Sequence, residues 1–358
     1  MSDVRAVVQT GVRKLELQRF ARPDVSDNDA LLRLEACGIC GSDYEQYAGD
    51  FARRYPVIPG HEPVGVIEEI GERAANRWRV GVGDRVVVEP MYNCGRCRGC
   101  QEGRLCLEAP GAYGYTSSDL PPHLWGGYAE YLYLAPGSVV HKVPAEIPPR
   151  LAALYNPLAA GFAWAQAVPN LSVGESIAIL GPGQRGLAAV IAADAAGADP
   201  IIVTGLSRDE AKLALAREFG ADLTINVESD DAVASIKDAT DGRGVDVVLD
   251  VTPYATTPVV ESLEMARRGG TIVLAGLKGP RRVPEFPSDR IIVRQLTLKG
   301  VLGVDYDSFE KALRLIESGR YPLEKLQTHT FPLEEAERAI RTLAGELDEL
   351  AINVTIEP

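Results

Sequence analysis

The chain has 358 residues, more than one hydrophobic core usually organises, so two domains are expected. Hydrophobic residues make up 46% and charged residues 24%, a composition typical of a folded globular protein. The formal net charge of −13 disfavours nucleic acids and anionic membranes as partners.

The six cysteines are too few for a disulfide scaffold, and none lies beyond residue 106. Clustered thiols in a chain without a secretory signal favour metal binding over disulfides. The N-terminal residues contain no apolar segment of a signal peptide. The apolar stretch 151–168 includes Asn156 and Pro157, so we expect a buried helix there and no membrane span. The sequence therefore predicts a cytoplasmic protein.

The first 150 residues are predicted to be β-rich, with short alternating runs at 30–34, 65–70 and 85–88. From residue 176, strands are expected over 177–180, 201–203, 245–251 and 271–275, and helices over 187–196, 209–219 and 256–267. This alternation predicts an α/β domain with a parallel sheet. Beyond about 298 we expect helices over 308–318 and 333–343, and a closing strand over 352–356.

A glycine-rich loop follows the expected strand 177–180 and opens an alanine-rich helix. It consists of Gly181, Pro182, Gly183, Gln184, Arg185 and Gly186. The glycines permit a tight turn, close approach to a pyrophosphate and close helix–strand packing, and the helix N-terminus offers N–H groups to the phosphates. The loop predicts dinucleotide binding, although a purely structural glycine turn is the alternative.

The end of the second strand bears on the choice between NAD and NADP. Gly205 stands where NAD-dependent proteins carry a ribose-binding acid, and Arg208 and Ser207 are suited to a 2′-phosphate. We therefore expect NADP to be preferred, with NAD possible. In the alternative, Arg208 is a solvated charge and Asp209 binds the ribose. Thr252, after the expected strand 245–251, is also assigned to the cofactor site.

Four cysteines are crowded into thirteen residues: Cys94, Cys97, Cys100 and Cys106. Four thiolates at this spacing suit a closed tetrahedral zinc site of the structural type, in a lobe over about 90–108. A disulfide or redox role is the alternative, but bonds within so short a segment would be strained.

A second constellation combines Cys40 with His61 and Glu62 about twenty residues further on. A thiolate, an imidazole and a carboxylate suit an open, catalytic zinc site. The alternatives are an ordinary buried histidine and a weak redox pair of Cys37 with Cys40.

Taken together, these motifs resemble the zinc-containing medium-chain alcohol and polyol dehydrogenases over essentially the full chain. The motifs are residues 38–43, 60–62 with Gly65, 83–86, the four-cysteine lobe, 126–131, 181–183 and 269–271. The resemblance implies a GroES-like β-rich catalytic domain over 1–155, an inserted Rossmann domain with a doubly wound sheet over 156–298, and a return to the catalytic domain over 299–358.

The resemblance also implies a mechanism. Zinc held by Cys40 and His61, with Glu62 as a ligand in the resting state, polarises an alcohol or carbonyl oxygen. Hydride then passes between the substrate carbon and the nicotinamide of NAD(P). Ser42 matches the hydroxyl that relays the alcohol proton.

The chain departs from the family pattern at three positions. Asn156 stands where many relatives carry a charged or thiol zinc ligand, and an amide oxygen is a weaker, neutral ligand. Glu45 stands where alcohol dehydrogenases often carry the histidine that ends the proton relay, and it is either that acceptor or a surface carboxylate. Cys106 follows a shorter spacing than usual.

The predicted function is a zinc-dependent oxidoreductase acting on an alcohol or polyol, assembled as a homodimer or homotetramer. Tyr47, Trp125 and His123 are candidates for the substrate pocket, and 301–304 for a subunit interface. One alternative is a zinc-free NADPH-dependent reductase of C=C bonds in the same superfamily. A non-enzymatic nucleotide sensor or zinc-lobe interaction protein is the other.

Overall fold

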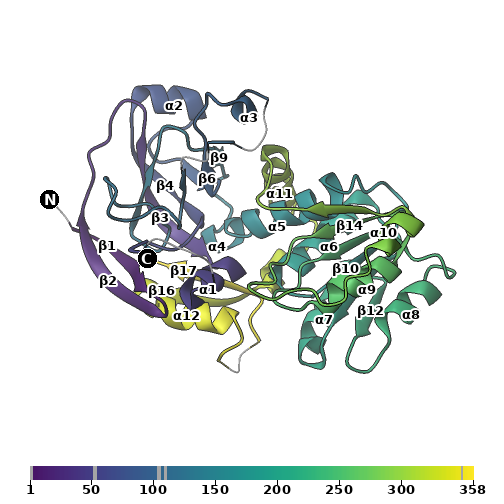
Figure 1. The fold of residues 1–358 in the computed structure, drawn as a ribbon. Helices are drawn as coiled ribbons and strands as arrows, with labels where there is room; N and C mark the ends of the chain where they lie inside the picture. Colours follow the sequence, from purple (N-terminus) through teal and green to yellow (C-terminus); the bar gives the residue numbers. More distant parts are fainter. Residues whose placement is uncertain (1–2, 51–54, 103–105, 109–110, 348–349) are drawn as a thin grey trace. The chain divides into compact units, whose positions relative to one another are not determined.

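The computed structural model of the chain describes residues 3–50, 55–102, 106–108, 111–347 and 350–358. The chain divides into two compact units, each with its own principal sheet and hydrophobic core (Figure 1). The first unit contains Met1–Asn156 and Leu313–Pro358, and the second contains Pro157–Ala312. The first unit is therefore built from both ends of the chain.

A seven-stranded sheet organises the first unit. Its strands are β3 (Ala30–Gly38), β4 (Glu62–Ile70), β5 (Arg85–Val88), β8 (Tyr131–Leu134), β9 (Val140–Lys142), β16 (Gln327–Pro332) and β17 (Asn353–Glu357). They follow the order β16-β17-β3-β4-β5-β9, and β8 pairs with β3. Strand β3 is almost entirely buried because it lies centrally and both of its faces are covered. Strands β1 (Asp3–Gly11) and β2 (Lys14–Ala21) form a separate hairpin.

Short helices and strands complete the first unit. They are α1 (Gly41–Ala48), α2 (Glu72–Trp78), α3 (Arg98–Gln101), α4 (Pro149–Ala152), α12 (Ala336–Leu343), β6 (Met91–Tyr92) and β7 (Gly111–Ala112), with 3-10 turns at Leu323–Leu326 and Leu333–Glu335. One core joins the two chain segments, because Phe331, Ile340 and Ile356 from the C-terminal segment are buried in the same cluster as Leu31 and Ile39.

The second unit contains a six-stranded parallel sheet. Its strands are β10 (Ile177–Leu180), β11 (Ile201–Gly205), β12 (Leu223–Asn226), β13 (Val245–Asp250), β14 (Ala266–Leu274) and β15 (Thr297–Gly300), in the order β12-β11-β10-β13-β14-β15. Its helices are α6 (Gln184–Ala196), α7 (Glu210–Glu218), α8 (Ala232–Asp238), α9 (Thr257–Met265) and α10 (Asp289–Arg294). Helix α6 packs with α7, and α8 packs with α9, as in a doubly wound Rossmann sheet.

Two features differ from the sequence-based expectation. The stretch 151–168 is not one helix: it comprises α4, α5 (Tyr155–Gly161) and a π-helical segment, Phe162–Ala167. Pro157 lacks the N–H that a continuous helix would need there, so the helix restarts. Strand β15 crosses the expected boundary at 298, and the second unit continues to Ala312, within α11 (Tyr306–Ser318). Among the described residues, no helix is both long and apolar enough to cross a bilayer.

Candidate active site

Three potential metal ligands converge at the ends of two neighbouring strands of the first sheet. Cys40 is the N-cap of α1, two residues after β3, and Glu62 is the first residue of β4 and pairs with Gly38. One donor atom from each of Cys40, His61 and Glu62 lies within 4.8 Å of the other two. Gly38 permits this approach, because a Cβ there would lie 2.5 Å from Glu62 Oε2.

The buried carboxylate of Asp43 orients two members of this cluster. Asp43 Oδ2 accepts a hydrogen bond from the backbone N–H of Cys40 at 2.8 Å, and Oδ1 lies 3.3 Å from His61 Nδ1. A carboxylate behind a ligating histidine sets its tautomer and ring orientation. Asp43 is therefore placed to orient both the Cys40 backbone and the His61 ring.

A tyrosine that carries no recognisable motif joins the cluster. The Tyr115 hydroxyl donates a hydrogen bond to Ser42 Oγ at 2.9 Å, and the Tyr115 ring centroid lies 5.2 Å from that of His61. Burial raises the pKa of Tyr115 to about 12, so its phenol stays protonated and can donate at neutral pH. Its place in the Gly111–Tyr115 segment gave no indication of this contact.

The four cysteines of the expected lobe are also brought together. The sulfur atoms of Cys97 and Cys100 lie 3.5 Å apart, Cys97 and Cys106 3.8 Å, and Cys94 and Cys100 3.9 Å. Backbone N–H groups of Cys100 and Leu107 point at Cys97 Sγ and hold the pKa of that thiol below its usual value, to about 6. Cys106 joins the set in spite of its short spacing. Residues 103–105 of the expected lobe lie outside the described residues.

Three further residues singled out in the sequence differ in burial. Glu45 is half-buried on α1 and is not part of the three-ligand cluster. Asn156 is buried as the second residue of α5. Cys37 is fully buried in the core of the first unit, where burial raises the pKa of its thiol.

The three residues considered for the substrate pocket make structural contacts. The Tyr47 hydroxyl donates to Glu337 Oε1 at 2.7 Å, which ties α1 to α12. Trp125 Nε1 donates to the carbonyl of Leu120 at 2.8 Å. His123 Nδ1 lies 2.8 Å from the carbonyl oxygen of Ser118.

The glycine loop of the second unit is shaped to receive an anion. Gly181 has a φ of 103°, and a Cβ on Gly186 would lie 1.9 Å from the carbonyl oxygen of Gly181. Gly183 is the N-cap of α6 and has no side chain to cap the helix, and the space beside its Cα is open. The first N–H groups of this 13-residue helix are therefore available to a phosphate. Gln184 and Arg185 are its first two residues, and the Arg185 guanidinium lies 5.6 Å from the Trp164 ring.

Thr252 follows β13, beside the glycine loop. A Cβ on Gly181 would lie 3.0 Å from Thr252 Cγ2, and Thr252 Oγ1 donates to Asp250 Oδ1 at 2.5 Å. The fully buried Asp250 also forms an ion pair with Lys278, at 2.8 Å between Oδ2 and Nζ. The carboxyl ends of β10, β13 and β14 are thus tied together at the edge where Rossmann sheets bind their ligands.

The exposed turn after β11 contains Ser207 and Arg208, which the sequence assigns to the cofactor. Asp209 does not point into open space, because its Oδ2 accepts a hydrogen bond from the Leu206 N–H at 3.1 Å. The Ser207 N–H donates at 2.8 Å to Glu228, a residue that sequence patterns did not single out.

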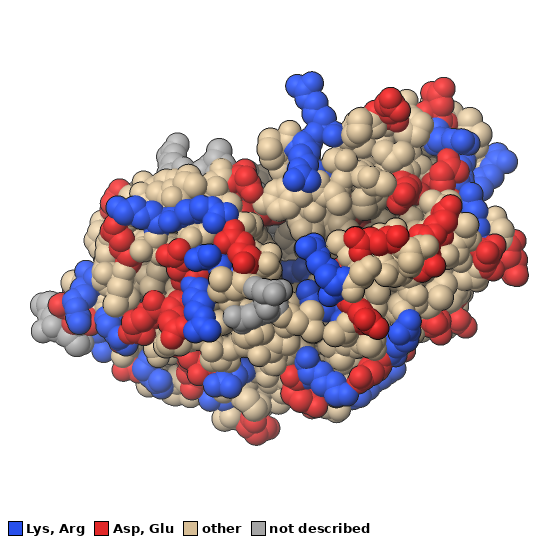
Figure 2. Space-filling view, turned by 90° about the horizontal axis from the view of Figure 1, so that it is seen from below, with Lys and Arg blue, Asp and Glu red and all other residues tan. Residues whose placement is uncertain are grey.

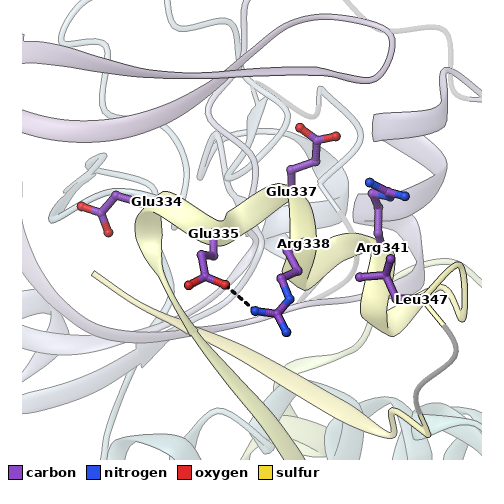
Figure 3. A pocket seen from close by; sticks show the side chains of 6 residues that line it. All are labelled: Glu334, Glu335, Glu337, Arg338, Arg341 and Leu347. Carbon is purple, nitrogen blue, oxygen red and sulfur yellow. Dashed lines mark hydrogen bonds and ion pairs between the residues drawn. The ribbon is translucent and has the colours of Figure 1, made fainter.

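A charged groove on the first unit runs along α12, apart from the metal-ligand cluster. It is lined by Glu334, Glu335, Glu337, Arg338, Arg341 and Leu347 (Figure 3). Arg338 and Glu335 pair across 2.9 Å, and Glu337 holds the Tyr47 hydroxyl. The groove is the outer side of the contact between α12 and α1, and it contains none of the predicted site residues.

The second unit combines a Rossmann sheet with an open glycine loop, and the first unit carries a Cys–His–Glu cluster and a four-cysteine lobe. Together these features define a zinc-dependent, dinucleotide-linked oxidoreductase. The chain belongs to the zinc-containing medium-chain alcohol dehydrogenase family. The family profile for the alcohol dehydrogenase GroES-like domain matches residues 26–145, and that for zinc-binding dehydrogenases matches residues 186–318.

Relatives cover the chain from end to end. A Mycobacterium tuberculosis protein named "Probable alcohol dehydrogenase adh" is 45% identical over 97% of both chains. An erythritol/L-threitol dehydrogenase of Mycolicibacterium smegmatis is 32% identical, over 98% of this chain and 97% of its own. The structure of a protein from Sinorhizobium meliloti 1021, described as a zinc-binding dehydrogenase and bound to NADP, matches with a TM-score of 0.87, 28% identity and full coverage of both chains.

These similarities confirm the predicted fold class and the prediction of an NAD(P)-dependent alcohol or polyol dehydrogenase that uses zinc. The zinc-free reductase is not favoured, because the chain has the zinc-ligand set and matches the zinc-binding dehydrogenase family. The non-enzymatic interpretation is set aside, because the relatives are dehydrogenases over their whole length.

Proposed function

We propose that this dehydrogenase interconverts a secondary alcohol or polyol and its ketone or aldehyde, with Cys40, His61 and Glu62 as the ligands of a catalytic zinc ion. The observation that carries the proposal is the convergence of these three donors within 4.8 Å, beside the Ser42–Tyr115 hydrogen bond. A secondary-alcohol or polyol substrate is supported by the erythritol/L-threitol dehydrogenase among the relatives.

The donor types support two zinc ions with different tasks. One thiolate, one imidazole and one carboxylate leave room for a fourth, exchangeable ligand, for which we assign the neutral amide of Asn156 or the substrate. The thiolates of Cys94, Cys97, Cys100 and Cys106 supply four ligands and close the second site, which is structural. When bound, zinc polarises the substrate oxygen and NAD(P)⁺ accepts the hydride.

Ser42 exchanges the substrate proton. Its Oγ accepts a hydrogen bond from Tyr115, which fixes the hydroxyl rotor so that the Ser42 proton can point at the reacting oxygen. Glu45 lies on α1 three residues after Ser42, on the same side of the helix, and is the proposed acceptor further out.

The cofactor lies on the open loop of the second unit. Gly181, Pro182, Gly183 and Gly186 form the turn that receives the pyrophosphate, at the N-terminus of α6. Thr252 borders this loop. Ser207 and Arg208 hold a 2′-phosphate, so NADP is preferred and NAD is possible; the NADP-bound structure from Sinorhizobium meliloti supports this assignment.

We further propose a homodimer or homotetramer in the cytoplasm, where four zinc-binding thiols stay reduced. Ile292 and Val293 on α10 and Leu302 just after the edge strand β15 are 75%, 67% and 82% exposed, and exposed apolar side chains beside a sheet edge are suited to contact with a second copy. Acidic and basic side chains are interspersed over the face shown in Figure 2, and we propose no nucleic-acid or membrane partner.

A spectrophotometric screen of alcohols and polyols with NAD⁺ and NADP⁺ tests the proposal. We expect turnover that a zinc chelator abolishes, two zinc ions per chain, and one zinc ion with no turnover in Cys40→Ala. Cys37→Ala is the matched control, because it removes a thiol three positions away that lies in the core and outside the cluster. Full turnover in Cys40→Ala would contradict the proposal.

A further inference from the structure

The end of β12 contributes a carboxylate to the turn that follows β11. The two strands are parallel neighbours, with Gly205 opposite Asn226. Two residues later, Glu228 Oε2 accepts a hydrogen bond from the Ser207 N–H at 2.8 Å, and Asn226 Nδ2 donates to Ser207 Oγ at 3.0 Å. The N–H and the hydroxyl oxygen of Ser207 are thus engaged by the last residue of β12 and by the turn that follows it.

Glu228 is held in this position and is charged. Its own N–H donates to Asn226 Oδ1 at 3.1 Å, which shapes the turn that carries it. Hydrogen bonds from Ser207, and to a lesser extent the nearby charge of Arg208, lower the pKa of Glu228 below its usual value. The turn after β11 therefore faces a full negative charge at neutral pH.

Among the described residues, the two positions that usually carry such an acid, 205 and 209, offer no unengaged carboxylate to this turn. A side chain at Gly205 would meet Pro182 of the glycine loop, because a Cβ there lies 2.9 Å from Pro182 Cγ. Asp209 caps the Leu206 N–H and lies 3.7 Å from Lys212 Nζ. The carboxylate that does contact this turn is Glu228, two residues after the third strand, β12.

We propose that Glu228 determines how the chain discriminates at the 2′ position of the adenosine ribose. Its carboxylate accepts a hydrogen bond from the 2′-hydroxyl of NAD and repels the 2′-phosphate of NADP, which the guanidinium of Arg208 attracts. This inference rests on the proposed dinucleotide site. Since Arg208 and Glu228 act in opposite directions, the wild-type chain binds both cofactors, and its preference for NADP is smaller than Arg208 alone would give.

The expected effect follows from the charges. A phosphate with about two negative charges and a carboxylate about 6 Å away in water repel each other enough to change affinity about tenfold. Removing the charge of Glu228 while keeping an acceptor for Ser207 isolates this contribution, and glutamine does both.

The test is titration of the full chain with NADPH and with NADH in the absence of substrate. Cofactor fluorescence monitors the binding. For Glu228→Gln we expect the ratio of the NADPH to the NADH dissociation constant to fall about tenfold. Glu228→Ala, which also frees the Ser207 N–H, should lower this ratio by at least the same factor. Asp241→Asn is the matched control: it removes an exposed charge just before β13, at the opposite end of the sheet's strands, and should leave the ratio unchanged.

The outcomes separate the two proposals. If the ratio of the NADPH to the NADH dissociation constant is the same in the wild type and in both Glu228 variants, Glu228 does not discriminate between the cofactors. This inference is then overturned, while the dinucleotide site stands. If neither cofactor binds the wild-type chain, the proposed site itself fails, and the inference fails with it.

Discussion

Replacing Tyr115 with phenylalanine removes a single hydroxyl and keeps the ring beside His61. The hydroxyl is the donor of the 2.9 Å hydrogen bond to Ser42 Oγ. A neutral hydrogen bond contributes about 0.5–1.5 kcal/mol. If that contribution orients Ser42 when the proton moves, its loss reduces kcat by about twofold to tenfold, since about 1.4 kcal/mol of barrier corresponds to a factor of ten.

The assay is steady-state oxidation of the best alcohol from the screen, with kcat and KM measured separately. We expect Tyr115→Phe to lower kcat and to leave the zinc content unchanged. Tyr113→Phe is the matched control, because it removes another buried tyrosine–serine hydrogen bond in the same segment, from Tyr113 to Ser138 at 2.5 Å. That variant should lower the melting temperature and leave kcat nearly unchanged.

A double-mutant cycle with Ser42→Ala decides whether Tyr115 acts through Ser42. Without the serine hydroxyl the Tyr115 hydroxyl has lost its target, so Tyr115→Phe should no longer change kcat in the Ser42→Ala background. A loss of kcat as large in that background as in the wild type would refute the reasoning and assign Tyr115 a separate role.

Three other changes probe different parts of the chain. Cys106→Ser should lower the zinc content by one ion per chain and lower the melting temperature. Retention of both ions would contradict the assignment of Cys106 as a ligand of the structural zinc. Arg208→Ala should raise the dissociation constant of NADPH about tenfold and that of NADH less, because a charge-assisted phosphate contact is lost; fluorescence titration measures both. Hydrogen bonds from Arg13 and Tyr44 lower the pKa of Glu346 to about 2. The ionised Glu346 carboxylate therefore stabilises the fold fully at pH values above the pKa of the unfolded chain, near 4.5. Glu346→Gln should therefore lower the melting temperature at pH 7, with a difference that shrinks from about pH 4.5 and vanishes near pH 2; a difference independent of pH would be inconsistent with this.

Hydrophobic patterning predicted the inner strands of the Rossmann sheet, because β10, β11 and β13 are apolar runs buried on both faces. The strand expected over 177–180 has those bounds in the structure, as does the strand expected over 85–88 in the first unit. Strand β12 and helix α8 were not predicted, since Leu223–Asn226 is only partly buried and Ala232–Asp238 is short and mostly polar. Strand β15 was also not predicted, and the expected domain boundary at 298 falls within it, because its side chains are partly exposed at the sheet edge.

The metal-site residues could be proposed from spacing, because zinc ligands of known type recur at short intervals. Tyr115 and Glu228 could not be proposed from sequence spacing. Each is separated by many residues from the serine that it contacts, and each depends on a loop meeting another element: Tyr115 reaches Ser42 on α1, and Glu228 reaches Ser207 across a strand pair. Such contacts have no local periodicity, so only the folded chain reveals them.

Pairing of β3 with β17 determines when the site can mature during synthesis. Cys37 on β3 lies opposite Ile356, and the N–H of Ile39, one residue before Cys40, donates to the carbonyl of Val354 at 2.9 Å. The contacts of the second unit, by contrast, lie within one continuous segment. The nucleotide-binding unit can therefore fold on the ribosome while β3, already paired with β4 and β8, still lacks β17. The segment leading to Cys40 acquires its final shape only after β17 is made, and until then the exposed strand edge is open to aggregation.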